Sequence, residues 1–193
     1  MNTVTEAFHD WKSRPWQPIS RVAASIWVAF YCLFLLHALR NASGFPLIDN
    51  SNLVVHEAGH LLFGWFGETI GLYGGTLLQL LVPSALAGSF AYRRHTAGTA
   101  FCAFFFFENF LYTATYMADA RVQELPLVSV GGGEAVDHDW ARIFTGLGLL
   151  QHDTQIASAV RVLGWAGMLA VVVWLVWRAW QDRNATQARA ASA

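Results

Sequence analysis

Residues 53–63 read LVVHEAGHLLF and place two histidines and a glutamate inside an otherwise apolar segment. Residues four apart on a helix lie on one face about one turn apart, so His56 and His60 are placed to hold one metal ion. Glu57 can reach a water at such an ion without being a ligand, as in other H-E-x-x-H helices. Polar side chains surrounded by hydrocarbon cost free energy unless they are coordinated or hydrogen-bonded. The stretch therefore predicts a buried helix that carries a metal centre.

The composition of the 193-residue chain is that of an integral membrane protein, because 55% of its residues are hydrophobic and only 13% are charged. A formal net charge of −1 disfavours a nucleic-acid partner, which requires a basic face. Cys32 and Cys102 both lie in apolar runs, so we expect unpaired thiols rather than a disulfide. The predicted location is the bilayer of a bacterial-type inner or plasma membrane, as a multi-pass protein.

Apolar runs of membrane-helix character predict an all-α, polytopic bundle of four to five transmembrane helices, one of which carries the H-E-x-x-H motif. We expect a cytoplasmic tail over residues 1–20, a membrane-embedded domain over 21–178 and a polar tail over 179–193. Asp139–Leu150 is expected to be a short interfacial helix after a hydrophilic loop. The predicted long helices are Val22–Leu39, Asn50–Phe66 with the motif, Leu77–Tyr92, Thr96–Ala118 and Ile156–Trp177.

Two membrane topologies are open. If the motif helix spans the membrane and the N-terminus is cytoplasmic, Arg93 and Arg94 lie outside, against the positive-inside tendency. If the motif helix is re-entrant, both arginines lie on the cytoplasmic side together with Lys12, Arg14 and Arg21. The charges fit the second topology better, and the sequence leaves the choice open.

A catalytic zinc site needs a third protein ligand and an open position. Glu108 is the predicted third ligand. If the motif helix and the Thr96–Ala118 helix start on the same side, His60 and Glu108 lie at matching depths of about 15 Å. A carboxylate in a phenylalanine-rich segment also has the greatest need for a cation.

The other acidic and imidazole residues leave alternatives. Asp119 is expected to pair with an arginine or to cap a helix end, and His138 and Asp139 could fold back over the site and supply a ligand. Asn109 could orient a ligand, hold substrate backbone or make an ordinary interhelical hydrogen bond.

The motif in an apolar helix, followed by Gly74-Gly75 at the entry to another membrane helix, resembles the site-2 protease family of intramembrane zinc metalloproteases, in particular its short single-domain branch. The resemblance covers Leu53 to Asp119 and is specific at His56, Glu57 and His60. It implies that the two histidines bind Zn²⁺, that the glutamate activates water, and that the protein hydrolyses a peptide bond in a membrane-associated polypeptide. The Asp-Gly turn that supplies the third ligand in that family does not occur here.

Two other functions remain open from the sequence. The chain could retain the metal without catalysis, as an inactive metal-binding membrane protein. It could also be a b-type haem protein, since His37, His56 and His60 all lie in apolar segments. Two histidines four residues apart on one helix are poorly placed to bind opposite faces of one haem, and haem leaves Glu57 unexplained.

Overall fold

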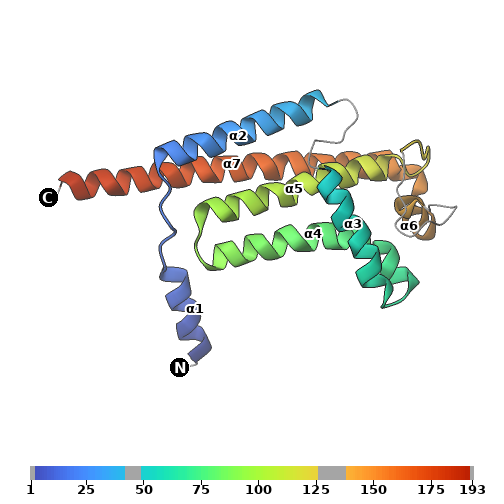
Figure 1. The fold of residues 1–193 in the computed structure, drawn as a ribbon, viewed down its shortest axis with the longest axis horizontal. Coiled ribbons are helices and arrows are strands. Elements are labelled where there is room, and N and C mark those ends of the chain that lie inside the picture. The colour runs from blue at the N-terminus through green and yellow to red at the C-terminus, as the bar shows by residue number, and fades with distance from the viewer. Residues whose placement is uncertain (1–2, 42–48, 126–137, 192–193) are drawn as a thin grey trace.

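The computed structural model describes residues 3–41, 49–125 and 138–191, and this part of the chain is helical with no strand (Figure 1). The helices are, in chain order, α1 (Thr3–Ser13), α2 (Arg21–Arg40), α3 (Asp49–Gly64), α4 (Glu68–Tyr92), α5 (Thr96–Ala118), α6 (Asp139–Leu147), the short 3₁₀ helix η1 (Leu150–His152) and α7 (Asp153–Ala191). The predicted loop with Gly131-Gly132-Gly133 lies outside the described residues. The all-α class is confirmed.

Three helical stretches are long and apolar enough to cross a membrane: α2, α4 and Leu150–Ala188, which contains most of α7. The prediction of four to five spans is therefore met in part by the described residues. α5 has the length of a span but carries polar residues such as Glu108 and Asn109, which are buried within the protein. Helix α5 packs along both α4 and α7 and forms the centre of the bundle (Figure 1).

The core around α5 is built from aromatic rings and small residues. The Tyr31 ring of α2 stacks on the Phe104 ring of α5 with 4.4 Å between centroids, and both residues are fully buried. On α7, a Cβ at Gly167 would lie 2.1 Å from Phe107 Cδ1, so only glycine at position 167 leaves room for the Phe107 ring. Close approach through small residues is the usual way in which membrane helices pack.

Helices α3 and α4 form a hairpin whose backbones touch. A Cβ at Gly59 would lie 2.2 Å from the Gly74 carbonyl oxygen, and a Cβ at Gly74 would lie 2.6 Å from the Gly59 carbonyl oxygen. The turn between the helices contains Gly67 at φ +110°, a conformation that only glycine adopts without strain. The expectation that small residues let the following helix pack closely on the motif helix is confirmed.

Three predicted boundaries differ from the observed ones. Helix α4 begins at Glu68 rather than Leu77, because its glycines provide interhelical contact instead of ending the helix. Helix α7 continues to Ala191 through the predicted polar tail, whose alanine, glutamine and arginine residues favour helix. The predicted N-terminal tail contains α1, which is held where Trp11 Nε1 donates to the Tyr92 carbonyl (2.9 Å) and Arg94 stacks over the Trp11 ring.

The cysteines behave as expected. Cys32 is exposed, Cys102 is buried, and both are free thiols.

Candidate metal centre

The H-E-x-x-H motif lies on α3 and places its two imidazoles side by side. The ring centroids of His56 and His60 are 4.7 Å apart, and their Nε2 atoms are 3.0 Å apart. The spacing of four residues on one helix face accounts for this approach. His56 is buried, and His60 is half-buried. Both Nε2 atoms therefore point to one common position, as the sequence predicts.

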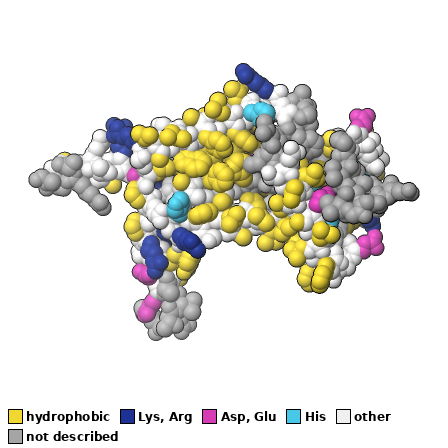
Figure 2. Space-filling model, in the orientation of Figure 1, with side chains coloured by type: hydrophobic (Ala, Val, Ile, Leu, Met, Phe, Trp, Pro, Cys, Tyr) yellow, Lys and Arg dark blue, Asp and Glu magenta, His cyan; other side chains and the backbone are white. Residues whose placement is uncertain are grey.

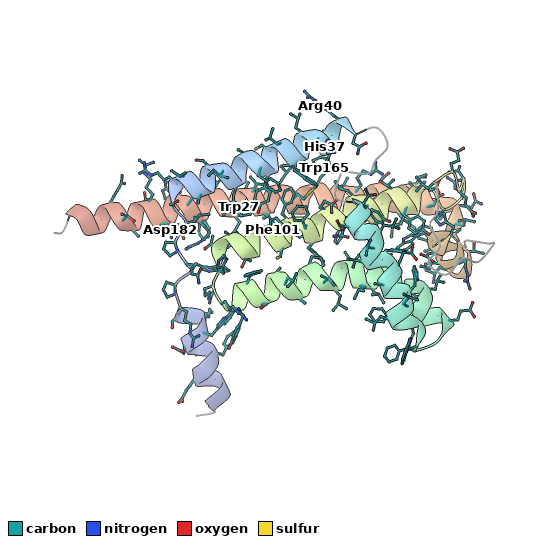
Figure 3. All side chains as sticks on the ribbon, viewed as in Figure 1. Trp27, His37, Arg40, Phe101, Trp165 and Asp182 are labelled. Carbon is teal, nitrogen blue, oxygen red and sulfur yellow. The ribbon has the colours of Figure 1, made fainter. Side chains whose placement is uncertain are left out.

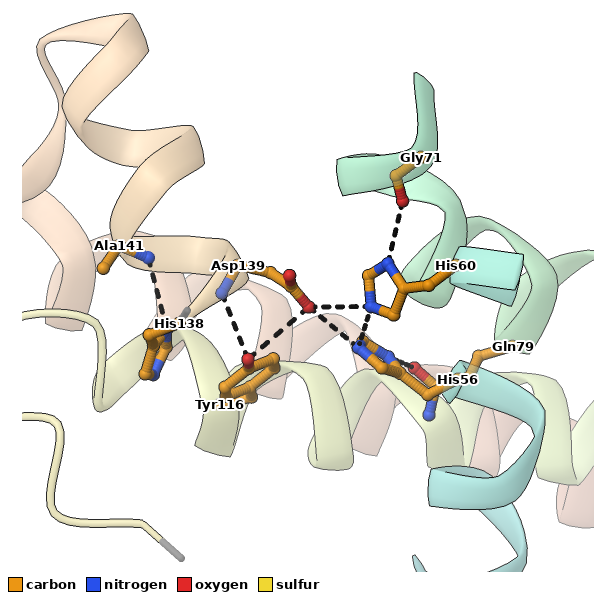
Figure 4. Close-up of polar contacts among 8 residues, drawn as sticks. All are labelled: His56, His60, Gly71, Gln79, Tyr116, His138, Asp139 and Ala141. Carbon is orange, nitrogen blue, oxygen red and sulfur yellow. Dashed lines mark hydrogen bonds and ion pairs between the residues drawn. The ribbon is translucent and has the colours of Figure 1, made fainter. Parts of the chain in front are cut away.

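Helix α4 fixes the orientation of both rings through their Nδ1 atoms. His56 Nδ1 lies 2.8 Å from Gln79 Oε1, and His60 Nδ1 lies 2.8 Å from the Gly71 carbonyl oxygen (Figure 4). Since both partners are acceptors, each Nδ1 carries the proton and each Nε2 presents a lone pair. Histidines that bind metals are held in this way by a second hydrogen bond.

Gly75 provides the space for the two imidazoles. A Cβ at this position would lie 2.5 Å from both Cε1 and Nε2 of His56 and 2.6 Å from His60 Nε2. The backbone of α4 therefore touches the metal-facing nitrogens directly, and a larger residue has to displace them.

The substitution Gly75→Ala is expected to displace both rings, to weaken zinc binding at least tenfold and to destabilise the protein by about 1–3 kcal/mol through overpacking. Gly88→Ala on the same helix is the matched control, because a Cβ there meets nothing within 4 Å. Zinc titration and thermal unfolding in detergent measure both effects. Equal zinc affinity in the two variants would contradict this account of Gly75.

Asp139, the first residue of α6, completes the cluster. Its Oδ2 lies 2.9 Å from His56 Nε2 and 3.0 Å from His60 Nε2 (Figure 4). His56, His60 and Asp139 are the one group of three or more metal-ligating side chains found within the described ranges. The three atoms form a nearly equilateral triangle.

The prediction that Glu108 is the third ligand is corrected by this geometry. Glu108 is fully buried on α5 and is not part of the cluster; its Oε2 accepts a hydrogen bond from Asn52 Nδ2 at 3.0 Å. The buried Glu108 carboxylate is therefore hydrogen-bonded to a neutral side chain and does not require a metal ion as its partner.

The depth comparison behind Glu108 is wrong because α3 crosses α5 obliquely (Figure 1). Asn52, two turns before His60, is the α3 residue beside Glu108. Of the two α5 tyrosines beside His56, Tyr116 has the shorter distance between ring centroids, 5.8 Å against 6.4 Å for Tyr112. Glu108 and Tyr116 are eight residues apart, which is about 12 Å along α5. Glu108 therefore lies at the level of Asn52 rather than at that of the two histidines.

The remaining predicted residues have structural partners. Asn109 Nδ2 donates to the Phe105 carbonyl of its own helix (2.8 Å), so this hydrogen bond is neither interhelical nor with the cluster. Asp119 caps the end of α5, as one alternative predicted, and its carboxylate accepts the backbone N–H groups of Glu124 (2.9 Å) and Leu125 (3.2 Å). The alternative pairing of Asp119 with an arginine is wrong, since Arg121 pairs with Asp153 and Arg161 donates to Thr115.

A clasp of Tyr116, Asp119 and His138 holds Asp139 in place. The Asp139 backbone N–H donates to the Tyr116 hydroxyl oxygen (3.1 Å), and the hydroxyl lies 3.5 Å from Asp139 Oδ2. His138 caps α6 by accepting the Ala141 N–H, and its Nε2 lies 3.3 Å from Asp119 Oδ2. The Tyr116 and His138 rings are in contact at 4.3 Å between centroids. The clasp therefore sets the backbone from which the Asp139 carboxylate projects.

Replacing Tyr116 by phenylalanine is expected to weaken zinc binding about 10- to 100-fold, the range seen when an outer partner of a metal ligand is lost. Competition with a chromophoric chelator measures the affinity. Tyr31→Phe is the control, because Tyr31 is also buried and its hydroxyl has no hydrogen-bond partner within the described residues. An unchanged affinity in Tyr116→Phe, or an equal loss in both variants, would show that the clasp does not position Asp139.

The electrostatics of α6 favour an ionised third ligand. Burial by itself raises the pKa of the Asp139 carboxyl, but hydrogen bonds from His56 and His60, which form when Nε2 carries a proton in place of a metal, outweigh burial and lower the pKa to about 2. Burial lowers the pKa of His138 despite the nearby Asp119 carboxylate. Asp139 is thus a carboxylate at neutral pH, the form that binds metals.

Glu57 remains available beside the cluster. It is half-buried on α3, close enough to His60 and Tyr116 for electrostatic interaction. Its carboxylate accepts no hydrogen bond from the residues described. A carboxylate with this position and freedom suits a general base.

The haem alternative gains no support from this geometry. Axial ligands of one haem approach the iron from opposite faces, whereas the Nε2 atoms of His56 and His60 are 3.0 Å apart on one side of α3. His37 is exposed near the end of α2, close to Arg40 (Figure 3).

Comparison with known proteins gives no relative from which to transfer a function. No protein-family model, no curated protein and no solved structure matches the chain. Any function of this chain is therefore inferred from the residues of the cluster and their geometry.

Sequence reasoning missed the residues that support the ligands. Gln79 carries a detectable signal, because it is a polar residue within an apolar helix and is buried. The roles of Gly71, Gly75 and Tyr116 depend on contacts between helices and have no signal in the local pattern.

Proposed function

We propose that the protein is a membrane-embedded zinc metalloprotease in which His56, His60 and Asp139 bind Zn²⁺ and Glu57 is the general base. The observation that carries the proposal is the convergence of two imidazole Nε2 atoms and one carboxylate oxygen within 2.9–3.0 Å of one another. With both Nδ1 atoms directed at acceptors, these three atoms all present lone pairs. Such an arrangement is stabilised by a cation, or by protons in its place.

The donor set fits zinc. Two histidines and one carboxylate are the protein ligands of many catalytic zinc sites, which leave a fourth position open. Ligand atoms about 2.0–2.1 Å from a tetrahedral zinc are about 3.3 Å from one another. The observed separations need to expand by only a few tenths of an ångström, and harder cations such as Mg²⁺ prefer oxygen ligands.

The residues support hydrolysis of a peptide bond. Zn²⁺, when bound, supplies Lewis acidity, which lowers the pKa of a coordinated water and polarises a carbonyl group. Glu57 takes the proton of the attacking water and delivers it to the leaving amine. Asp139 remains ionised and the two imidazoles remain neutral through the cycle, because Gln79 and Gly71 keep the proton of each imidazole on Nδ1 and leave Nε2 unprotonated.

The membrane is the environment of this activity. Helices α2, α4 and α7 meet the requirements for spanning, and α5, packed between α4 and α7, is proposed as a fourth crossing helix. The polypeptide substrate is proposed to be membrane-associated, since the centre is built on helices of this bundle. The proposed location is multi-pass in a bacterial-type inner or plasma membrane.

The test uses the full-length protein reconstituted in liposomes with a fluorogenic peptide carrying a membrane anchor. Wild-type protein loaded with zinc is expected to cleave the peptide, and removal of zinc by a chelator is expected to abolish cleavage until zinc is restored. Stoichiometric zinc without cleavage of any anchored peptide would favour the inactive metal-binding alternative.

A further inference from the structure

The two ends of the bundle differ in charge. One end holds α1, the start of α2, the α4–α5 turn and the last turns of α7 (Figure 1). Lys and Arg side chains gather there, while Asp and Glu side chains are prominent at the opposite end near α6 (Figure 2). The basic end carries Lys12, Arg14, Arg21, Arg93, Arg94, Arg178 and Arg183 against the acids Glu6, Asp10 and Asp182. The opposite end carries Glu68, Asp119, Glu124, Asp139 and Asp153 against Arg40, Arg121 and Arg142.

This asymmetry orients the bundle in a bilayer. Loops and helix ends rich in Lys and Arg remain on the cytoplasmic side. The basic end is therefore cytoplasmic, and α2, α4, α5 and α7 cross alternately from it. In chain order, helix α3 lies between the far end of α2 and the start of α4, and both of these helix ends lie at the non-cytoplasmic end (Figure 1). This arrangement is the re-entrant alternative, which accommodates all the basic segments on one side.

The metal centre lies at the non-cytoplasmic end of the bundle. Tyr116 is two residues before the end of α5, and Gly71 is in the first turn of α4. These offsets are about 3 Å and 5 Å along their helices. Asp139 belongs to α6, outside the long helices, and Gln79 supports His56 from deeper in the bundle.

A groove of about 350 Å³ lies at the same end of the bundle as the centre, between the start of α4 and α6. Leu72, beside Gly71, and Ile143, one turn after Asp139, form apolar parts of its lining. Glu68 and Arg142 form an ion pair at the groove. An apolar lining with a charged pair matches a polypeptide at the point where it passes from lipid to water.

We infer that the metal centre opens to the non-cytoplasmic side and that its substrate is a polypeptide segment leaving the membrane on that side. The groove between α4 and α6 binds this segment beside the scissile bond. This inference rests on the proposed hydrolase function for the substrate, but the orientation of the centre is independent of activity.

The orientation is tested with single-cysteine variants in a Cys32→Ser/Cys102→Ala background that retains wild-type zinc content. Gln151→Cys is at the metal-centre end and Arg93→Cys is at the basic end, and both positions are exposed. A membrane-impermeant maleimide applied to intact spheroplasts is expected to label Gln151→Cys, and to label Arg93→Cys only after permeabilisation. The reverse pattern, or labelling of both in intact spheroplasts, would overturn the inferred orientation.

The substrate side is tested with a single-span reporter that carries an unstructured segment and a different epitope tag on each face of the membrane. Loss of the non-cytoplasmic tag alone, dependent on Glu57, supports the inference, and loss of the cytoplasmic tag overturns it. Gly146→Phe projects into the groove, where a Cβ meets nothing within 4 Å, and should raise KM at least tenfold with unchanged zinc affinity. If neither tag is lost while the maleimide labels as expected, the substrate assignment and the proposed hydrolysis both fail, and the orientation of the centre stands.

Discussion

Asp139→Ala is expected to weaken zinc binding by more than about 100-fold. Loss of a residue that only supports a metal ligand costs about 10- to 100-fold, and this substitution removes a proposed ligand itself. The two histidines alone leave zinc one protein ligand short of the usual catalytic set. Chelator competition on purified protein measures the affinity, and hydrolysis should fall to the level of metal-free protein.

Glu108→Gln is the matched control for Asp139→Ala. It keeps the size of a buried side chain and an oxygen that accepts from Asn52, and it should bind zinc as the wild type does. A larger loss of zinc in Glu108→Gln than in Asp139→Ala would restore Glu108 as the ligand and refute the assignment to α6.

Glu57→Gln is expected to retain stoichiometric zinc and to lose about 10²- to 10⁴-fold in kcat, the usual contribution of a general base. The amide keeps the shape of the side chain but cannot accept the proton of the attacking water. Zinc content and the rate of peptide cleavage, measured on the same preparation, separate the two effects.

Glu124→Gln makes the same chemical change on an exposed side chain after α5 and should leave kcat unchanged. Wild-type cleavage by Glu57→Gln would remove the general-base role while leaving the metal site in place. Loss of zinc from Glu57→Gln would instead indicate that the carboxylate takes part in metal binding.

The regular helices were largely predictable because apolar runs and helix boundaries are local features of sequence. The predicted Thr96–Ala118 helix agrees with α5 at both ends, and Val22–Leu39 lies within α2. The start of α4 was missed because Gly71, Gly74 and Gly75 resemble a helix break in sequence. Their contacts with α3 give them a packing role that only the folded hairpin reveals.

The third ligand was the least predictable part of the site. Burial favoured the wrong candidate, because Glu108 is fully buried, whereas the Asp139 side chain is 14% exposed. Two tertiary features decide which carboxylate reaches the histidines: α3 crosses over α5, and α6 packs back against Tyr116. Both depend on contacts between residues far apart in sequence. The H-E-x-x-H pair needed no such information because its geometry is set within one helix.

The most direct measurement is zinc K-edge X-ray absorption on the purified full-length protein, together with its zinc content. The account predicts one zinc per chain, with two imidazole nitrogens and one carboxylate oxygen from the protein at about 2.0–2.2 Å. The spectrum should lose its carboxylate contribution in Asp139→Ala. Wild-type protein without stoichiometric zinc, or a spectrum that is identical in Asp139→Ala, would contradict the proposed centre.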